Sequence, residues 1–364
     1  MNILIDVNHP AQVHYFKNLY KELIPKHNVY FSCKKVPLIE TLLTAYHIPY
    51  INYGEKKDNI LSKAFYQLKY DMECYKAIKN LNIDIALGSS ASNVHAAKFT
   101  KAISIATTDS DLSAIPIAAK FVYPLADYLM TPDALAYQNY PKQICYPGYQ
   151  ELAYLHPNRF SPDPSVLDEC GLKMGEPFFI LRFTAFKAHH DIGMYGLSKE
   201  QKWNLIKLLE KYGKIFITSE VNDPEFTPFY LHITPEKIHS LMYYASMLIC
   251  DSQTMTTEAA VLGTPAFRCN TFAGKLTVIE EIEKLYDLAY SYHPIHYNWM
   301  IRKIESVLNT DNYKELWQVK RKRMLKEKID VTAFWVWLLE NAPISFERVR
   351  KNKIDFDQFK QINK

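Results

Sequence analysis

The chain has 364 residues, which is too long for one ordinary core and suits two domains. Hydrophobic residues make up 48% of it and charged residues 23%, as in an ordinary globular protein. The 43 Lys and Arg against 39 Asp and Glu leave a net charge of +4, too small to indicate nucleic-acid binding, and no apolar stretch approaches the ~18 residues of a membrane span.

Strands and helices alternate along the first part of the chain. Residues 2–7 form an apolar strand, Asn8–Pro10 a turn, and residues 12–24 an amphipathic helix. Further strands are predicted at 29–33, 49–53, 83–87, 102–106 and 128–130, with helices at 38–46 and 60–81. Such alternation predicts parallel strands joined by helical crossovers.

The second part of the chain repeats this plan after an irregular segment. Residues 143–164 contain four prolines and no long periodic pattern, so we interpret them as the crossing between domains. Strands are then predicted at 178–183, 214–218, 231–233, 247–250 and 265–268, with helices at 199–212, 236–244 and 258–262. We expect an N-terminal domain (1–145), a C-terminal domain (146–330), and a C-terminal helix and tail (331–364) that crosses back to the N-terminal domain.

The segment DSQTMTTEAAVLGTP, residues 251–265, is the most informative pattern in the chain. An apolar strand leads directly into a hydroxyl-rich helix start, and Gly263 and Pro265 end the helix. The hydroxyls belong to Ser252, Thr254, Thr256 and Thr257. A helix N-terminus offers unpaired N–H groups and a positive dipole end, so these residues are predicted to bind a diphosphate, and Glu258 to accept hydrogen bonds from a ribose. The competing interpretation is a capped helix whose Ser and Thr side chains satisfy their own backbone.

This segment resembles the nucleotide-sugar site in the second domain of GT-B glycosyltransferases and of non-hydrolysing UDP-N-acetylglucosamine 2-epimerases. Together with ILIDVNHPAQVH (3–14) and GYQELAYLHP (148–157), it is similar to the family of domain of unknown function 354, which is placed near those enzymes. The resemblance covers about residues 1–340. It implies an α/β, GT-B-type fold with two Rossmann-like, doubly wound parallel-sheet domains that face a central cleft.

Residues on the donor side follow from the rule that ligands bind beyond the carboxyl ends of parallel strands. Arg182 suits a diphosphate, since a guanidinium binds phosphate oxygens bidentately, although an interdomain salt bridge is the alternative. Similarity to GT-B enzymes places His239 near the nucleobase. The predicted donor residues are Arg182, Thr184, Ser219, His239, Ser252, Gln253, Thr254, Thr256, Thr257 and Glu258.

The same rule selects acceptor-side and catalytic residues. The predicted acceptor-side residues are Asn8, His14, Ser90 and His95. His9 directly follows the first strand, and because imidazole titrates near neutral pH it is predicted to be the general base. A His9 that only caps the helix is the competing interpretation. Asp109 and Asp111 are alternative bases, and Glu220, which closes a strand, either orients the sugar, acts as a base or is a solvated loop residue.

We expect neither a metal nor a cofactor besides the nucleotide-sugar substrate. His189, His190 and Asp191 resemble a metal cluster, but adjacent histidines of an extended chain point in different directions and no third ligand is evident. The six cysteines include no C-x-x-C pair and are predicted to be reduced core residues. The N-terminus leads into a strand without the regions of a secretion signal, so we expect a cytoplasmic protein.

The basic segment from Lys320 to Lys328 is predicted to lie on a helix that leads to the aromatic segment 331–339. Its charges are either solvated or in contact with anionic lipid at the inner membrane face, and nucleic acid is the least favoured partner.

The function predicted from these patterns is glycosyl transfer. A nucleotide-sugar, most favourably UDP-linked, donates to a hydroxyl of a glycan or lipid-linked acceptor in cell-surface polysaccharide or glycolipid synthesis, without a metal. One alternative is a non-hydrolysing UDP-sugar 2-epimerase. The epimerase pattern has a Gly-rich turn where this chain has Gln253-Thr254, and this difference argues against that alternative. A second alternative is a non-catalytic nucleotide-sugar-binding scaffold.

Overall fold

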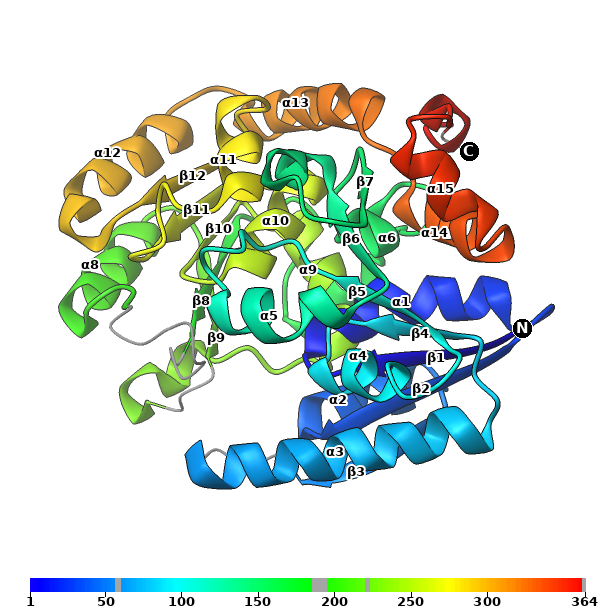
Figure 1. Cartoon of the computed structure of the whole chain (residues 1–364). Coiled ribbons are helices and arrows are strands. Elements are labelled where there is room, and N and C mark those ends of the chain that lie inside the picture. The colour runs from blue at the N-terminus through cyan, green and yellow to red at the C-terminus, as the bar shows by residue number, and fades with distance from the viewer. Residues whose placement is uncertain (56–59, 185–194, 220–222, 362–364) are drawn as a thin grey trace. The chain divides into compact units, whose positions relative to one another are not determined.

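The computed structural model describes residues 1–55, 60–184, 195–219 and 223–361 (Figure 1). The chain divides into two compact units: unit 1 is Met1–Arg159 with Lys328–Lys364, and unit 2 is Phe160–Glu327. The expected division after residue 145 therefore lies within unit 1. The C-terminal segment that belongs with unit 1 starts at Lys328 instead of residue 331.

Unit 1 is built on a seven-stranded parallel sheet in the order β3-β2-β1-β4-β5-β6-β7. Its strands are β1 (Asn2–Val7), β2 (Asn28–Lys35), β3 (Tyr50–Glu55), β4 (Ile85–Gly88), β5 (Ile103–Thr107), β6 (Tyr128–Pro132) and β7 (Gln143–Tyr146). Its helices include α1 (Pro10–Leu23), α2 (Pro37–Ala45), α3 (Ile60–Asn80), α4 (Ala91–Ala97), α5 (Pro116–Phe121) and α6 (Leu152–Leu155). The strand order reverses between β1 and β4, so the loops after these strands lie at the position where open sheets bind ligands.

The interpretation of residues 143–164 as an irregular crossing is wrong for its first part. Gln143–Tyr146 form β7, the edge strand that pairs with β6 through Thr131 and Cys145, and Leu152–Leu155 form α6. β7 has only two buried residues, Ile144 and Tyr146, and so lacks the continuous apolar run that marks β10 (Met247–Cys250), which is equally short.

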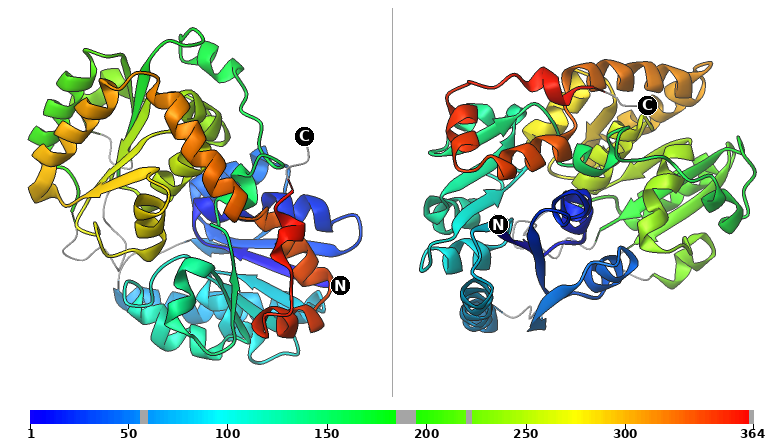
Figure 2. Two further views of the ribbon diagram at one scale, coloured as in Figure 1. Left: turned by 90° about the horizontal axis from the view of Figure 1, so that it is seen from above. Right: turned by 90° about the vertical axis from the view of Figure 1, so that its right-hand side faces the viewer.

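The C-terminal segment completes the core of unit 1. α14 (Val331–Glu340) and α15 (Ile344–Arg350) follow the segment from Lys328, and α14 lies beside α1 in both Figures 1 and 2. Trp335 is 1% exposed, and its ring centroid lies 5.4 Å from that of Phe16 and 6.1 Å from that of Tyr146. α14 therefore supplies apolar contacts that the first 159 residues do not contain.

Unit 2 has a five-stranded parallel sheet in the order β12-β11-β10-β8-β9. Its strands are β8 (Phe178–Phe183), β9 (Lys214–Ser219), β10 (Met247–Cys250), β11 (Ala266–Cys269) and β12 (Ala289–Tyr292). Its helices are α7 (Ser165–Glu169), α8 (Lys199–Leu209), α9 (Ile238–Tyr244), α10 (Gln253–Leu262), α11 (Thr277–Lys284), α12 (Tyr297–Leu308) and α13 (Tyr313–Glu327) among the described residues. The order reverses between β8 and β10, which places the loops after these two strands at the switch point of the sheet.

In unit 2, one predicted strand does not form and one observed strand was not predicted. Residues 231–233 are not a strand; only a backbone bond from Leu231 N to Ile217 O and an isolated bridge at Tyr230 attach this segment to β9. Prolines at 228 and 235 confine the apolar run, so it is too short for a ladder. β12 was not predicted, because Tyr290 and Tyr292 alternate with small residues and give little apolar signal.

The packing of α14 predicts that substitutions of two tryptophans change the stability of the protein by different amounts. Trp335→Ala removes a buried ring from the contact with Phe16 and is expected to lower the free energy of unfolding by about 3–5 kcal/mol. Trp299 is 58% exposed, so Trp299→Ala is expected to change it by only about 0.5 kcal/mol. Urea denaturation followed by circular dichroism measures both. Equal effects of the two substitutions would contradict the placement of α14 in the core of unit 1.

Candidate functional site

The transition from β10 to α10 forms the centre of the candidate site in unit 2. The strand ends at Cys250, and Ser252 is the N-cap of α10, where its Oγ accepts a hydrogen bond from Met255 N at 3.4 Å. Gly263 ends the helix in the left-handed conformation, with φ 76°. The helix therefore starts with its positive dipole end at the switch point of the sheet.

Two of the threonine hydroxyls of α10 donate to the backbone at the start of the helix. Thr256 Oγ1 donates to Ser252 O at 2.6 Å and Thr257 Oγ1 to Gln253 O at 3.4 Å. For these two residues the geometry agrees with side chains that satisfy the backbone. The N–H groups of Gln253 and Thr254 have no acceptor within the helix, because the first N–H groups of any helix lack one. The anion-binding capacity of this turn therefore resides mainly in its backbone.

His239 and Glu258 form a buried pair beside this turn. His239 Nε2 lies 2.9 Å from Glu258 Oε1, and the pair joins α9 to α10. Both side chains are buried. The structure thus brings together two residues that were predicted separately, one near the nucleobase and one at the ribose.

The strands beside β10 add the other donor-side residues. Arg182 on β8 is in register with Cys250, and its Nη1 donates to Thr218 Oγ1 at 3.1 Å. Thr184 N donates to Asp251 Oδ1 at 2.8 Å, and Ser219 is the last residue of β9. Arg182, Thr184 and Ser219 therefore lie at the edge of the sheet where α10 starts.

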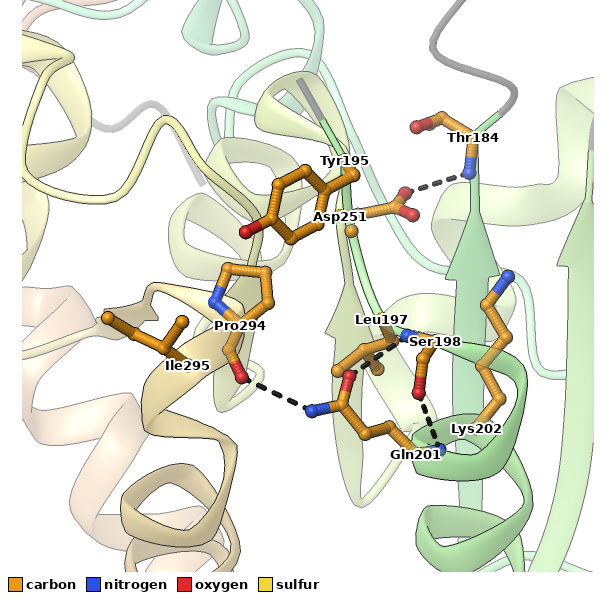
Figure 3. Close-up of a pocket in the computed structure, with 10 residues that line it drawn as sticks. Thr184, Tyr195, Leu197, Ser198, Gln201, Lys202, Asp251, Pro294 and Ile295 are labelled. Atoms are coloured by element: carbon orange, nitrogen blue, oxygen red, sulfur yellow. Dashed lines mark hydrogen bonds between the residues drawn. The ribbon is translucent and has the colours of Figure 1, made fainter. Parts of the chain in front are cut away.

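A cavity of about 640 Å³ lies at this edge on the side of α8 (Figure 3). Its lining consists of Thr184, Tyr195, Gly196, Leu197, Ser198, Gln201, Lys202, Asp251, Pro294 and Ile295. Burial raises the pKa of Asp251 to about 6 and lowers the pKa of Lys202. Perturbed ionisable groups in a cavity are typical of functional sites.

Sequence reasoning missed Gln201 and Lys202 at this cavity. Ser198 and Gln201 form a capping box at the start of α8, a signal that the sequence carries in SKEQ. Lys202 is the next residue and lies in the first turn of α8. The capping box would therefore have located the cation that lines the cavity.

His9 is the N-cap of α1. Its Nδ1 accepts a hydrogen bond from Ala11 N at 3.2 Å. In a neutral imidazole whose Nδ1 accepts, Nε2 carries the proton. This tautomer donates a proton at Nε2 and does not accept one, so the geometry favours the capping role over the role of general base.

The other acceptor-side residues take structural positions in unit 1. His14 is buried, with Nδ1 3.0 Å from Tyr46 Oη, and Asn8 N donates to Gln12 Oε1 at 2.8 Å. Ser90 is the N-cap of α4 and accepts from Ser92 N at 3.1 Å. These contacts account for local packing and capping, and nothing in them indicates a ligand.

Two of the predicted site residues in unit 1, His95 and Asp109, have shifted pKa values. His95 Nδ1 lies 2.9 Å from Asp71 Oδ2, and this hydrogen bond raises the pKa of His95. Burial raises the pKa of Asp109, and the hydrogen bond from Ser110 Oγ at 3.3 Å only partly opposes the effect. A carboxyl with a raised pKa holds a proton more readily than a free one, so Asp109 remains a candidate for proton transfer.

Several predicted residues lie outside the described residues. They are Glu220, His189, His190 and Asp191. Within the described ranges, no three His, Cys, Asp or Glu side chains form a group that could hold a metal ion. All six cysteines are unpaired, and four of them are buried.

The basic segment from Lys320 to Lys328 contains both structural and exposed charges. Lys320 Nζ lies 2.6 Å from Asp287 Oδ2, and the buried Lys328 Nζ lies 2.9 Å from Asp133 Oδ1. Lys322, Arg323 and Lys326 are exposed on α13. In the part of the chain that the structure describes, no helix has both the length and the apolar character needed to cross a membrane.

Known proteins share the fold of the whole chain. The sequence pattern of the family described as "Protein of unknown function (DUF354)" matches residues 1–332. A putative UDP-N-acetylglucosamine 2-epimerase from Listeria monocytogenes has a TM-score of 0.69 at 10% identity, over 98% of each chain. A search of curated proteins finds no significant sequence match.

Two further solved structures with this fold contain bound nucleotides. The UDP-GlcNAc 2-epimerase of Methanocaldococcus jannaschii in complex with UDP-GlcNAc and UDP has a TM-score of 0.63 at 13% identity, over 85% of this chain and 94% of that one. The glycosyltransferase VinC in complex with dTDP has a TM-score of 0.60 at 12% identity, over 96% and 100%. At such identities the likeness shows the fold. It confirms the predicted class, two parallel-sheet α/β domains of the GT-B type.

The raised pKa of Asp251 predicts a pH-dependent stability. Its carboxyl has a pKa of about 6 in the folded chain and about 3.9 when unfolded. Between these values only the folded state binds the proton, so the free energy of unfolding falls as the pH rises through this window. Relative to Asp251→Asn, the wild type is expected to lose about 2 kcal/mol between pH 4 and pH 7.

Urea titrations of both proteins at a series of pH values measure this difference. Asp168→Asn, at an exposed position of α7, serves as the reference for the general effect of removing a carboxylate. A difference between the wild type and Asp251→Asn that stays constant with pH would show that Asp251 is not desolvated.

Proposed function

The chain belongs to the DUF354 family of proteins of unknown function, and we propose that it is a glycosyltransferase whose donor is a UDP-sugar. Its acceptor is proposed to be a hydroxyl of a glycan or lipid-linked molecule in cell-surface polysaccharide or glycolipid synthesis. The solved structures that share its fold include both UDP-GlcNAc epimerases and glycosyltransferases.

The observation that carries the proposal is the start of α10 at the switch point of the unit 2 sheet. Backbone N–H groups at Gln253 and Thr254 point away from the helix, and the helix dipole places partial positive charge there. Arg182 lies in register with the last residue of β10 and adds a full positive charge. This combination supports the binding of a diphosphate.

The His239–Glu258 pair supports a nucleoside next to that diphosphate. Glu258 lies in the second turn of α10, and its carboxylate accepts from His239 at 2.9 Å. A carboxylate accepts several hydrogen bonds, so a glutamate at this position is chemically suited to the hydroxyls of a ribose. UDP is proposed because several solved structures with this fold contain UDP or UDP-GlcNAc.

The proposed chemistry separates leaving-group stabilisation from proton transfer. As the bond between sugar and diphosphate breaks, negative charge grows on the diphosphate, and fixed dipoles and cations stabilise that charge without reorganisation. α10 and Arg182 supply them in this proposal, so UDP binding is expected to persist in EDTA. Asp109 is proposed to accept the proton of the acceptor hydroxyl.

An epimerase reaction would use the same diphosphate site, so it must be distinguished by experiment. The epimerase pattern has a Gly-rich turn at the helix start, where this chain has Gln253 and Thr254. This difference favours transfer over epimerisation. The exposed Lys322, Arg323 and Lys326 are the proposed contact with anionic lipid at the inner membrane face.

Calorimetric titration of the full chain with UDP, dTDP, GDP, ADP and CMP, with and without EDTA, tests the donor site. UDP is expected to bind in both conditions. Ser252→Ala is expected to lower the affinity for UDP about threefold to tenfold, because it disturbs the first turn of α10. Asp355→Ala removes the N-cap of the 3-10 helix Phe356–Phe359 and is the control, for which UDP affinity is expected to be unchanged.

Absence of binding for all five nucleotides would overturn the proposed donor site. If UDP binds, UDP-GlcNAc in deuterated water distinguishes the reactions. An epimerase breaks the C–H bond at the second carbon of the sugar and incorporates deuterium there, whereas a transferase leaves this carbon unlabelled and releases UDP in the presence of an acceptor. Deuterium incorporation would contradict the transferase proposal.

A further inference from the structure

Five side chains form one row across the unit 2 sheet near the carboxyl ends of its strands. The register pairs Thr218 with Arg182, Arg182 with Cys250, Cys250 with Arg268, and Arg268 with Ser291. Residues in register on neighbouring strands point to the same face of a sheet. Two arginines therefore flank the last residue of β10 on one face.

The first turn of α10 covers the middle of this row. Cys250 Sγ lies 3.1 Å from Thr256 Oγ1 and 3.4 Å from Ser252 O. Because neighbouring strands are ~4.8 Å apart, the side chain of Arg268 leaves the sheet one strand away from the start of α10. Its electrostatic interaction with the Cys250 thiol agrees with this placement.

Arg268 is fully buried and makes few hydrogen bonds. It is 0% exposed, and its Nη2 donates to Phe272 O at 3.5 Å. Its Nε and Nη1 have no hydrogen-bond partner among the described residues. A guanidinium has five N–H donors, and leaving buried donors unsatisfied destabilises a fold. The contacts around Arg268 therefore do not explain why a cation occupies this position.

The nearest acidic residues do not neutralise Arg268 by direct pairing. Glu280 and Glu283 on α11 favour its charged form, but burial dominates and lowers its pKa to about 10. Glu283 Oε2 instead accepts from Ser291 N at 3.1 Å, and burial raises the pKa of Glu283. Arg268 thus remains protonated at neutral pH, as a buried positive charge close to the start of α10.

We propose that Arg268 is a positioning residue whose buried charge strengthens the binding of a diphosphate at the N-terminus of α10 without touching it. This inference rests on the proposed function. A charge in the protein interior is weakly screened, so it acts on a ligand without touching it. The effect grows with the charge of the ligand, whereas a purely structural role affects charged and neutral ligands alike.

Arg321 offers a matched control at the opposite end of the same helix. Its Nε donates to Val261 O at 2.7 Å in the last turn of α10, and burial lowers its pKa as well. Arg321→Met therefore removes an equal charge from a similarly desolvated position. Because it lies at the far end of α10, Arg321→Met is expected to leave ligand affinity unchanged.

The experiment measures the dissociation constants of uridine, UMP and UDP for the full chain by calorimetry. Arg268→Met is expected to weaken the binding of UDP about tenfold or more and that of UMP about threefold, and to leave the binding of uridine unchanged. Arg268→Lys keeps the charge and is expected to restore most of the UDP affinity. Thermal unfolding without ligand confirms that each variant folds, and Arg268→Gln replaces Arg268→Met if the latter does not.

Equal weakening of all three ligands by Arg268→Met, or no weakening, would overturn the inference. Inorganic pyrophosphate separates this failure from that of the proposed function. If the wild type binds pyrophosphate but not UDP, and Arg268→Met weakens pyrophosphate, the role of Arg268 stands and the UDP assignment fails. If the wild type binds neither ligand, both proposals fail.

Discussion

The arrangement of unit 2 depends on the hydrogen bond from Thr184 N to the carboxylate of Asp251. It joins the ends of β8 and β10 at the point where the strand order reverses, and Asn270 Nδ2 attaches the segment after β11 by donating to Asp251 O at 2.7 Å. One residue thus fixes three strand ends. Since the next residue, Ser252, caps α10, the position of the helix start follows from the same contact.

Asp251 and Ser252 also separate two environments on opposite faces of the sheet. On the face of α9 and α10 lie Arg182, Arg268 and the His239–Glu258 pair, whereas the 640 Å³ cavity with Lys202 lies on the face of α8. Burial raises the pKa of Asp251 and lowers the pKa values of Lys202 and Arg268, so the fold holds these charges at a cost in stability. Strain of this kind is typical of a site organised before its ligand arrives.

The sequence predicts those parts of the fold and site that span many residues. The apolar runs of β1 and β8 and the strand-to-helix pattern around Asp251 are unambiguous because they exceed the length at which periodicity appears. β7 and β12 lack the continuous apolar run that marks β4 and β10, although all four strands have the same length. The direction of a hydroxyl is not encoded in its residue type, so Thr256 and Thr257 were expected to face a ligand although they donate to the helix backbone. The isolated Arg268 has no pattern at all and becomes visible only through the strand register.

Unit 1 is discontinuous, because Met1–Arg159 requires α14 to complete its core. Translation releases the first segment, then all of unit 2, and only then Val331–Glu340. At about 5–20 residues per second this delay lasts on the order of ten seconds. During that interval Phe16 and Tyr146 lack the tryptophan that covers them in the finished protein. The nascent chain therefore passes through a stage in which unit 2 is complete while unit 1 still exposes an apolar surface. Chaperones that act at the ribosome would bind at that surface.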